Sequence, residues 1–159
     1  DTFSKAAWTA RQYAYAQAMG HGETVYTPQV VVNGKVAGDG VEPGEFAALL
    51  SRGERGPGGP GIAFSGGAVT IGRGAAPAGG AEVWLVRYIP RTVEVAIRRG
   101  ENAGHTLSYT HVVREMVLLG KWRGEAATFP APAGSDPSLA EAALVQADGA
   151  GPILAAAKR

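Results

Sequence analysis

The segment from Val25 to Gly34 most restricts what this chain can fold into, because it combines a proline, a run of valines and an Asn-Gly pair. Proline has no backbone donor, so Pro28 must stand at the first residue of a strand, where the chain enters a sheet. The valines predict a strand from Gln29 to Val32 that is buried on both faces. The pair Asn33-Gly34 tolerates the positive φ values of a tight turn, so the segment as a whole predicts a β-hairpin.

The segments on either side of this hairpin predict helices. From Asp1 to Met19, aromatic and apolar side chains recur about every 3.6 residues, which favours a helix whose aromatic stripe packs on a sheet. After the second strand, Lys35 to Ala37, the residues Glu42 to Ser51 predict a short helix with a proline in its first turn. We expect this helix to turn three apolar side chains inward: Phe46, Leu49 and Leu50.

This order of helix, Thr27-Pro28, buried strand, Asn-Gly turn, second strand and closing helix resembles the C-terminal half of a thioredoxin fold. In that fold the peptide bond before the proline is cis, a form that X-Pro bonds adopt far more readily than others. The alternative is a trans proline that opens an edge hairpin. The resemblance implies that Thr27 and Pro28 form a substrate platform, with the Thr27 backbone guiding a substrate strand by β-pairing. The alternative to a substrate platform is a structural role, in which Pro28 only fixes the point where the chain enters the sheet.

Residues 53–61 consist of Gly and Pro apart from Glu54 and Arg55, which predicts a linker between residues 1–52 and residues 62–159. Beyond the linker the apolar residues follow a period of two between glycine turns, and seven or eight short strands of this kind suggest a β-sandwich. The stretch from Leu107 to Leu119 fits a strand in part and coil in part. The other strands are predicted at Ile62–Phe64, Ala68–Ile71, Glu82–Ile89, Thr92–Arg98, Trp122–Phe129, Glu141–Gln146 and Pro152–Ala157. The predicted fold class is therefore α+β, a partial thioredoxin-like α/β unit followed by a β-sandwich-like domain.

Composition limits the chemistry. The net charge of +1, with scattered Lys and Arg, argues against a nucleic-acid or membrane-surface partner, and no apolar run reaches the roughly 18 residues of a membrane span. The chain has no cysteine, so its residues can form neither disulfides nor thiolates, and we expect no cofactor. Because it starts at Asp1, without Met or a leader, we expect a processed chain or a fragment.

Three groups of motifs carry a resemblance to a known family. They are Thr9–Ala16 before Val25–Gly34, then Arg99–Gly104 before His111–Arg114, then Val145-Gln146 and Gly151–Ala157. In this order and spacing they resemble the bacterial secreted proteins of domain-of-unknown-function family 1223, over nearly the whole chain. The resemblance implies a thioredoxin-like domain, a β-rich extension and a periplasmic or secreted location. It implies no established activity.

The chain departs from that family in one respect. Members typically open with a strand and a Cys-x-x-Cys helix, and neither is present in this sequence. A sheet without them leaves Val30–Val32 unpaired on at least one side, which is unfavourable for a buried strand. We therefore expect either upstream residues or a second chain, as a homo-oligomer or by strand exchange, to complete the sheet. The expected substrate or partner is a protein or peptide.

The second half carries one further candidate site, for a small ligand, formed by polar residues around a glycine-rich turn. The turn residues can instead satisfy their own backbone through Asx-type hydrogen bonds. Histidine and carboxylate side chains suit zinc, yet their spacing here fits no standard zinc site, so no metal is predicted. The candidate ligand-binding residues are Glu101, Asn102, His105, His111 and Arg114.

Two hypotheses about function follow. The intact protein is a periplasmic thiol-disulfide oxidoreductase-like protein, with Pro28 beside a reactive cysteine pair, or it is a non-catalytic scaffold that binds a ligand or protein. A Cys-x-x-Cys upstream of Asp1 would favour the first. Within these residues only the second is chemically possible, because thiol exchange needs a thiolate.

Overall fold

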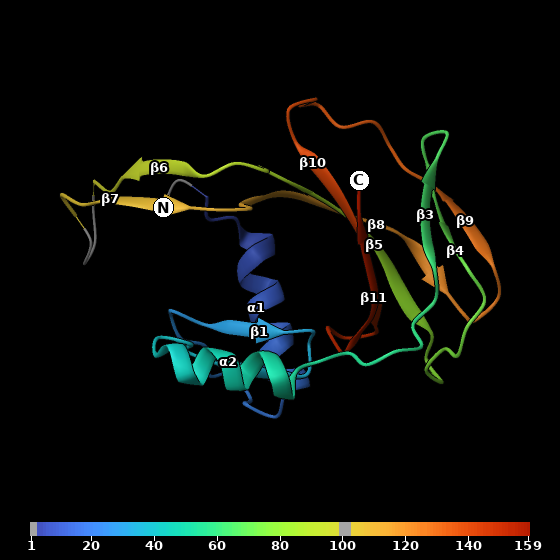
Figure 1. The fold of residues 1–159 in the computed structure, drawn as a ribbon, viewed down its shortest axis with the longest axis horizontal. Coiled ribbons are helices and arrows are strands. Elements are labelled where there is room, and N and C mark those ends of the chain that lie inside the picture. Colours follow the sequence, from blue (N-terminus) through green and yellow to red (C-terminus); the bar gives the residue numbers. More distant parts are fainter. Residues whose placement is uncertain (1–2, 99–102) are drawn as a thin grey trace.

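The computed structural model describes residues 3–98 and 103–159 as a mixed α+β chain in which strands predominate, which confirms the predicted fold class (Figure 1). Helix α1 (Ala6–Ala18) precedes a hairpin of β1 (Val30–Val32) and β2 (Val36–Gly38), and helix α2 (Pro43–Arg52) follows it. Neither of these helices is long and apolar enough to cross a membrane. The remaining strands are β3 (Ile62–Ser65), β4 (Ala68–Ile71), β5 (Ala81–Tyr88), β6 (Val93–Ala96), β7 (Thr106–Tyr109), β8 (Val113–Trp122), β9 (Ala127–Pro130), β10 (Ala140–Ala147) and β11 (Ile153–Lys158).

Two antiparallel sheets from the second half pack face to face as a sandwich. One sheet has the order β11-β10-β5-β8 and the other the order β3-β4-β9. Side chains alternate across each strand, so Val83 and Leu85 of β5 point between the sheets while Glu82 and Trp84 lie on the outer face. The resulting core consists of Val69, Ile71, Ala81, Val83, Leu85, Trp122, Ala143, Val145 and Ala155.

The hairpin of β1 and β2 forms a sheet of its own. Val31 pairs with Ala37, and the turn between the strands has positive φ at both Asn33 (51°) and Gly34 (64°), as the sequence predicts. The peptide bond between Thr27 and Pro28 is cis, as in the fold that this segment resembles.

The hairpin and α1 both contact the four-stranded sheet of the sandwich. The N–H of Ile153 donates to the carbonyl of Asn33 at 2.8 Å. A Cβ on Gly34 would lie 2.4 Å from the carbonyl oxygen of Gly151, so only glycine fits where the turn meets the β10–β11 connection. On the outer face of the sheet, Arg11 of α1 donates to the side chain of Gln146 on β10 at 2.6 Å.

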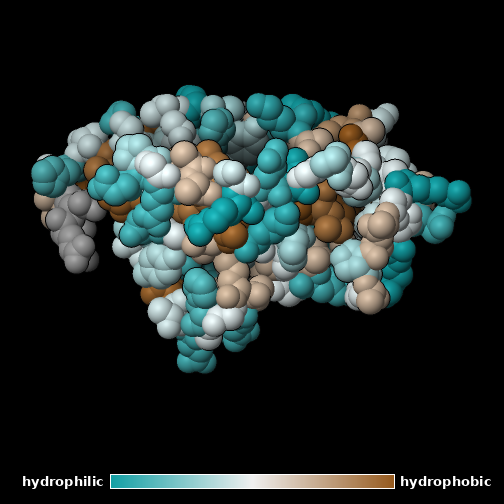
Figure 2. All heavy atoms as spheres, turned by 60° about the horizontal axis from the view of Figure 1, so that its bottom comes forward, coloured by the Kyte–Doolittle hydropathy of each residue, from teal (hydrophilic) through white to brown (hydrophobic). Residues whose placement is uncertain are grey.

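Several predictions about the first half are wrong in detail. The valines of β1 are half-buried and not fully buried, because β1 pairs only with β2 among the described residues. Of the apolar side chains on α2, Leu49 is buried, whereas Phe46 and Leu50 are 41% and 49% exposed. A two-stranded sheet is too narrow to cover the rest of the helix. Figure 2 shows this side of the molecule, where hydrophobic residues lie among hydrophilic ones.

Two strand boundaries in the second half also differ from expectation. The stretch 107–119 is interrupted by His111 at a φ of 52°, which separates β7 from β8. The stretch from Trp122 to Phe129 is divided by a turn that contains Gly124, so it supplies the end of β8 and most of β9. Periodicity alone did not separate strands joined by so short a turn.

Candidate functional site

A cavity of about 520 Å³ lies where α1, the loop before β1 and the start of β8 meet, and we refer to it as the first cavity. Trp8, Gln12 and Tyr15 face it together because residues three and four apart share one side of a helix. The loop before β1 contributes a second side, and β8 contributes apolar side chains. The residues that line the first cavity include Trp8, Gln12, Tyr15, Tyr26, Thr27 and Met116.

The loop at Thr27 is fixed to α1 and leaves its own backbone free. The side-chain amide of Gln12 donates to the carbonyl of Tyr26 at 3.2 Å. Thr27 and Pro28 are exposed, and the N–H and C=O of Thr27 make no backbone hydrogen bond within the described residues. The backbone of Thr27 is therefore available to pair with an extended chain in the first cavity.

A second cavity of about 350 Å³ adjoins the first, with which it shares Trp8, Arg11 and Met116. It lies between α1 and the outer face of β5. Most of its lining is apolar, and Glu82 is its acidic residue. Its lining is completed by Ala7, Ala10, Ala14, Trp84, Gly149 and Ala150.

Arg11 stands at the boundary of the two cavities, and its position is fixed by polar and aromatic contacts. One terminal nitrogen, Nη2, donates to the hydroxyl of Tyr15 at 2.9 Å and to Oε1 of Gln146 at 2.6 Å. The guanidinium carbon lies 5.0 Å from the ring centroid of Tyr15 and 5.5 Å from that of Trp84. Gln146 is fully buried, and its amide donates to the carbonyl of Gly151 at 2.8 Å.

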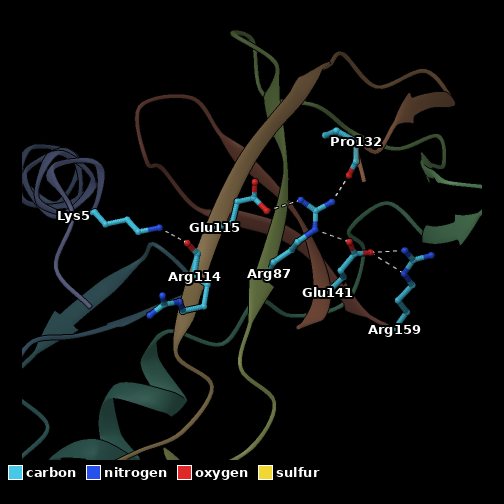
Figure 3. Close-up of polar contacts among 7 residues, drawn as sticks. All are labelled: Lys5, Arg87, Arg114, Glu115, Pro132, Glu141 and Arg159. Atoms are coloured by element: carbon cyan, nitrogen blue, oxygen red, sulfur yellow. Dashed lines mark hydrogen bonds and ion pairs between the residues drawn. The ribbon is translucent and has the colours of Figure 1, made fainter. Parts of the chain in front are cut away.

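A separate ionic cluster closes one end of the sandwich around Arg87 (Figure 3). In the sheet register Arg87 stands opposite Glu115 on β8 and Glu141 on β10, so all three side chains share one face. Arg87 donates to Glu115 at 2.6 Å, to Glu141 at 2.8 Å and to the carbonyl of Pro132, and Arg159 also pairs with Glu141.

These contacts shift the pKa values of the cluster toward the charged forms. Burial alone would lower the pKa of Arg87, yet its hydrogen bonds to Glu115 and Glu141 raise it above the usual value. Burial likewise acts to raise the pKa of Glu141, but hydrogen bonds from Arg87 and Arg159 bring it below its usual value. Because Arg87 is buried and paired with two carboxylates, the cluster is a structural element and offers no free charge to a ligand.

Comparison with protein families assigns this chain to a group. A family model described as a protein of unknown function, DUF1223, matches residues 1–146. The chain belongs to the DUF1223 family. The crystal structure of an Agrobacterium tumefaciens protein, solved by structural genomics, is similar to this DUF1223 chain with a TM-score of 0.74 and 27% identity. The alignment covers 99% of this chain and 72% of that one. No curated protein matches the chain.

Of the two predicted platform residues of this DUF1223 protein, Thr27 lines the first cavity, and Pro28 is exposed beside it without lining it. The structure does not bring the candidate residues of the second half together. His105 and His111 flank opposite ends of β7, whose rise of about 3.3 Å per residue separates them by about 20 Å. Glu101 and Asn102 lie outside the described residues. Within the described ranges, His, Asp and Glu side chains form no group of three that could hold a metal.

The two other predicted ligand-binding residues, His111 and Arg114, each lie beside an aromatic ring. The ring of His111 lies 5.5 Å from that of Tyr88, and the guanidinium of Arg114 lies 5.4 Å from the ring of Phe3. The carbonyl of Arg114 accepts a hydrogen bond from Lys5 at 2.6 Å (Figure 3). The small-ligand site therefore stays a prediction, and the described residues supply no cluster that supports it.

Sequence reasoning missed two residues of the candidate site in this DUF1223 chain, Arg11 and Gln146. The contact between them joins residues 135 positions apart, which no local pattern reveals. One signal was present, because Gln146 interrupts an otherwise apolar stretch of β10. A polar side chain in such a position is normally hydrogen-bonded, so it should have prompted a search for a partner.

Proposed function

We propose that this chain is a non-catalytic binding module that holds an extended polypeptide in the first cavity. The observation that carries the proposal is the position of Thr27, which lines the same cavity as Trp8 and Tyr15 and whose backbone pairs with no other described residue. An extended peptide would pair with the backbone of Thr27 and place apolar side chains against the aromatic rings. Main-chain pairing gives affinity in this mode, and side-chain pockets give specificity.

We read residues 1–52 as the retained part of a thioredoxin-like frame. The order of α1, the Thr27-Pro28 loop, β1, β2 and α2 supports this proposal. None of the 159 residues is cysteine, so the chain cannot exchange disulfides with its own side chains. A platform at Thr27 would serve redox chemistry only with cysteines supplied from outside these residues.

The test is binding of the neutral peptide Ser-Val-Leu-Val-Ala amide, carrying an N-terminal coumarin, measured by fluorescence anisotropy. We expect N-methylation of its central backbone amides to weaken binding about tenfold, because methylation removes main-chain donors while keeping the side chains. We expect Trp8→Ala to weaken binding similarly. Tyr13→Ala is the matched control, since Tyr13 is an exposed aromatic on α1 outside the cavity.

The proposal fails if the peptide does not bind. It also fails if Trp8→Ala and Tyr13→Ala bind the peptide equally well, or if methylated and unmethylated peptides do.

Two further properties are proposed on narrower grounds. The family resemblance supports a periplasmic or secreted location, which fractionation of the source bacterium would test. Strand β1, paired only with β2 among the described residues, supports strand exchange with a second copy. Light scattering during size-exclusion chromatography would detect a dimer, and a monomer at every concentration would contradict that proposal.

A further inference from the structure

Arg11 is a half-buried cation that forms no ion pair within the described part of the chain. No carboxylate of the described residues lies within ion-pairing distance of its guanidinium, in contrast to Arg87, which contacts two. A partly desolvated charge is costly unless an opposite charge or hydrogen bonds compensate it. The hydrogen bonds to Tyr15 and Gln146 compensate Arg11 in part and leave its positive charge uncancelled.

The guanidinium is also held in a defined orientation with donors to spare. Both of its hydrogen bonds use Nη2, so Nε and Nη1 donate to no described residue. A guanidinium carries five N–H groups in a planar fork, which matches the two oxygens of a carboxylate. The rings of Tyr15 and Trp84 limit its movement, so little rotamer entropy remains to be lost on binding an anion.

Two other cations lie beside aromatic rings of the first cavity. The ammonium of Lys5 lies 5.4 Å from the ring of Trp8, and Arg114 lies at the same distance from the ring of Phe3. Both rings line the first cavity. Glu82 lines the second cavity, where its carboxylate accepts a hydrogen bond from the indole N–H of Trp84 at 3.1 Å. Lys5 and Arg114 share a separate pocket with Glu115 and Asp136, so the charged residues that line the two cavities themselves are Arg11 and Glu82.

We propose that Arg11 binds a carboxylate of the peptide that occupies the first cavity, and that an apolar side chain beside this carboxylate fills the second cavity. The inference rests on the proposed function and specifies its ligand class as apolar peptides with a carboxylate. The second cavity suits an aliphatic side chain, because Ala10, Ala14 and Met116 line it. The carboxylate belongs to the C-terminus or to an acidic side chain of the peptide.

The experiment compares peptides on the unmodified protein. The first arm compares Ser-Val-Leu-Val-Ala with a free C-terminus against the same peptide as its amide, both with an N-terminal coumarin. The second arm compares Ser-Val-Leu-Glu-Ala amide with Ser-Val-Leu-Gln-Ala amide. We expect the carboxylate to tighten binding about tenfold in one arm, which corresponds to about 1.4 kcal/mol, at low salt. The difference should shrink in 0.5 M salt, because counter-ions screen a partly exposed pair.

Variants assign this effect to Arg11. We expect Arg11→Gln to remove the preference for the carboxylate, so that the carboxylate peptide and its amide bind this variant with equal affinity. Arg11→Lys should retain part of the preference, because it keeps the charge and loses the planar fork. Arg73→Gln is the matched control, since Arg73 lies on the exposed surface and pairs with Glu125. Glu82→Gln should tighten binding of the carboxylate peptide twofold or more, because it removes a competing negative charge.

The outcomes separate the two proposals. If no peptide binds, the proposed function and this inference both fail. If carboxylate and neutral peptides bind equally well in both arms, the inference about Arg11 fails while the proposed function stands. If Arg11→Gln does not fold, the inference is still tested by comparing the peptides on the native protein and on Glu82→Gln. If Glu82→Gln binds the carboxylate peptide no more tightly than the native protein does, the inference that Arg11 binds the carboxylate fails.

Discussion

The two halves of this molecule differ in how well they bury their own apolar side chains. In the sandwich, residues from both sheets are fully buried, among them Val69, Leu85, Trp122 and Val145. In the first half, Ala16 and Leu49 are the buried apolar side chains among the described residues, while Val41, Phe46 and Leu50 are substantially exposed. The sandwich therefore supplies its own stability, and the first half depends on its contacts with the sandwich.

This difference bears on where the proposed binding site lies. A closed core leaves no room for a ligand, and both cavities considered above lie outside it, between α1 and the neighbouring elements. The half with the fewer buried side chains carries the exposed loop at Thr27, an edge of β1 that no described strand pairs with, and Arg11, which has no carboxylate partner in the described ranges. The stable core and the proposed binding surface are thus divided between the two halves, consistent with the tendency of ligand-binding regions to be the less stable parts of a structure.

The largest effect on stability should come from Arg87→Ala. This change leaves Glu141, which is mostly buried, without one of its two cationic partners. Removing one member of a buried ion pair costs about 3–5 kcal/mol in the free energy of unfolding. The measurement is urea denaturation. Arg73→Ala, which breaks a fully exposed pair with Glu125, should change stability by less than about 1 kcal/mol. Equal effects of the two substitutions would show that the cluster does not stabilise the sandwich.

Leu85→Ala and Leu50→Ala test the comparison directly, since the same side chain is shortened in each half. Leu85 is fully buried between the sheets, so we expect a loss of about 2–5 kcal/mol. Leu50 is 49% exposed on α2, and we expect a loss of less than about 1 kcal/mol. Thermal and urea unfolding measure both. A large loss for Leu50→Ala would mean that another chain covers this face of α2 in solution.

Gly34→Ala should have an intermediate effect and reports how firmly the two halves are joined. The substitution combines a positive φ of 64° with a contact of 2.4 Å between the new Cβ and the carbonyl of Gly151. Gly66→Ala is its matched control, because Gly66 has a φ of 55° and open space around it. Each should lose about 1–2 kcal/mol from the backbone conformation.

We expect Gly34→Ala to lower the free energy of unfolding more than Gly66→Ala does. In Gly34→Ala, the carbonyl of Gly151 and the turn at Gly34 must also move apart. Hydrogen exchange of the Ile153 amide, which donates to Asn33 across this contact, should become faster only in Gly34→Ala. Equal stabilities and equal exchange would mean that the turn and the β10–β11 connection do not hold the halves together.

Much of this fold follows from local sequence signals. The hairpin was predictable because Pro28, the valines of β1 and the Asn33-Gly34 turn each restrict the backbone within a few residues. The strands of the sandwich were predictable because apolar residues alternate along them. The exposure of Phe46 was not predictable, because amphipathic spacing shows which face of a helix is apolar and not whether another element covers it.

The candidate site was only half predictable for the same reason. Thr27 could be named as part of a platform from the resemblance of its segment to a thioredoxin fold, and that role stays a prediction. Arg11 could not, because its role arises from Tyr15 on its own helix, Gln146 on a distant strand and the ring of Trp84. Contacts of this kind depend on how two elements dock, and a pattern within either element does not contain that information.

The smallest expected effect is a loss of stability in acid that comes from Glu141. Its pKa is below its usual value in the folded protein, because Arg87 and Arg159 hydrogen-bond to its carboxylate. A lowered folded-state pKa contributes stability that is present above the unfolded-state pKa and is lost as the pH falls through the folded value. The free energy of unfolding should therefore decline below the usual pKa of about 4.5. The effect is small because a protonated carboxyl still accepts a hydrogen bond from Arg87.

Urea denaturation between pH 3 and pH 7 measures this decline, and Glu141→Gln is the variant that identifies its source. We expect the variant to be less stable than the native protein at pH 7 and to lose less stability on acidification, because its amide does not titrate. Because Glu141 lies in the sandwich, its protonation should destabilise residues 62–159. This holds although residues 1–52 bury fewer of their apolar side chains. An identical pH dependence in native protein and Glu141→Gln would assign the acid sensitivity to other carboxyls, such as Asp136, whose pKa is also lowered.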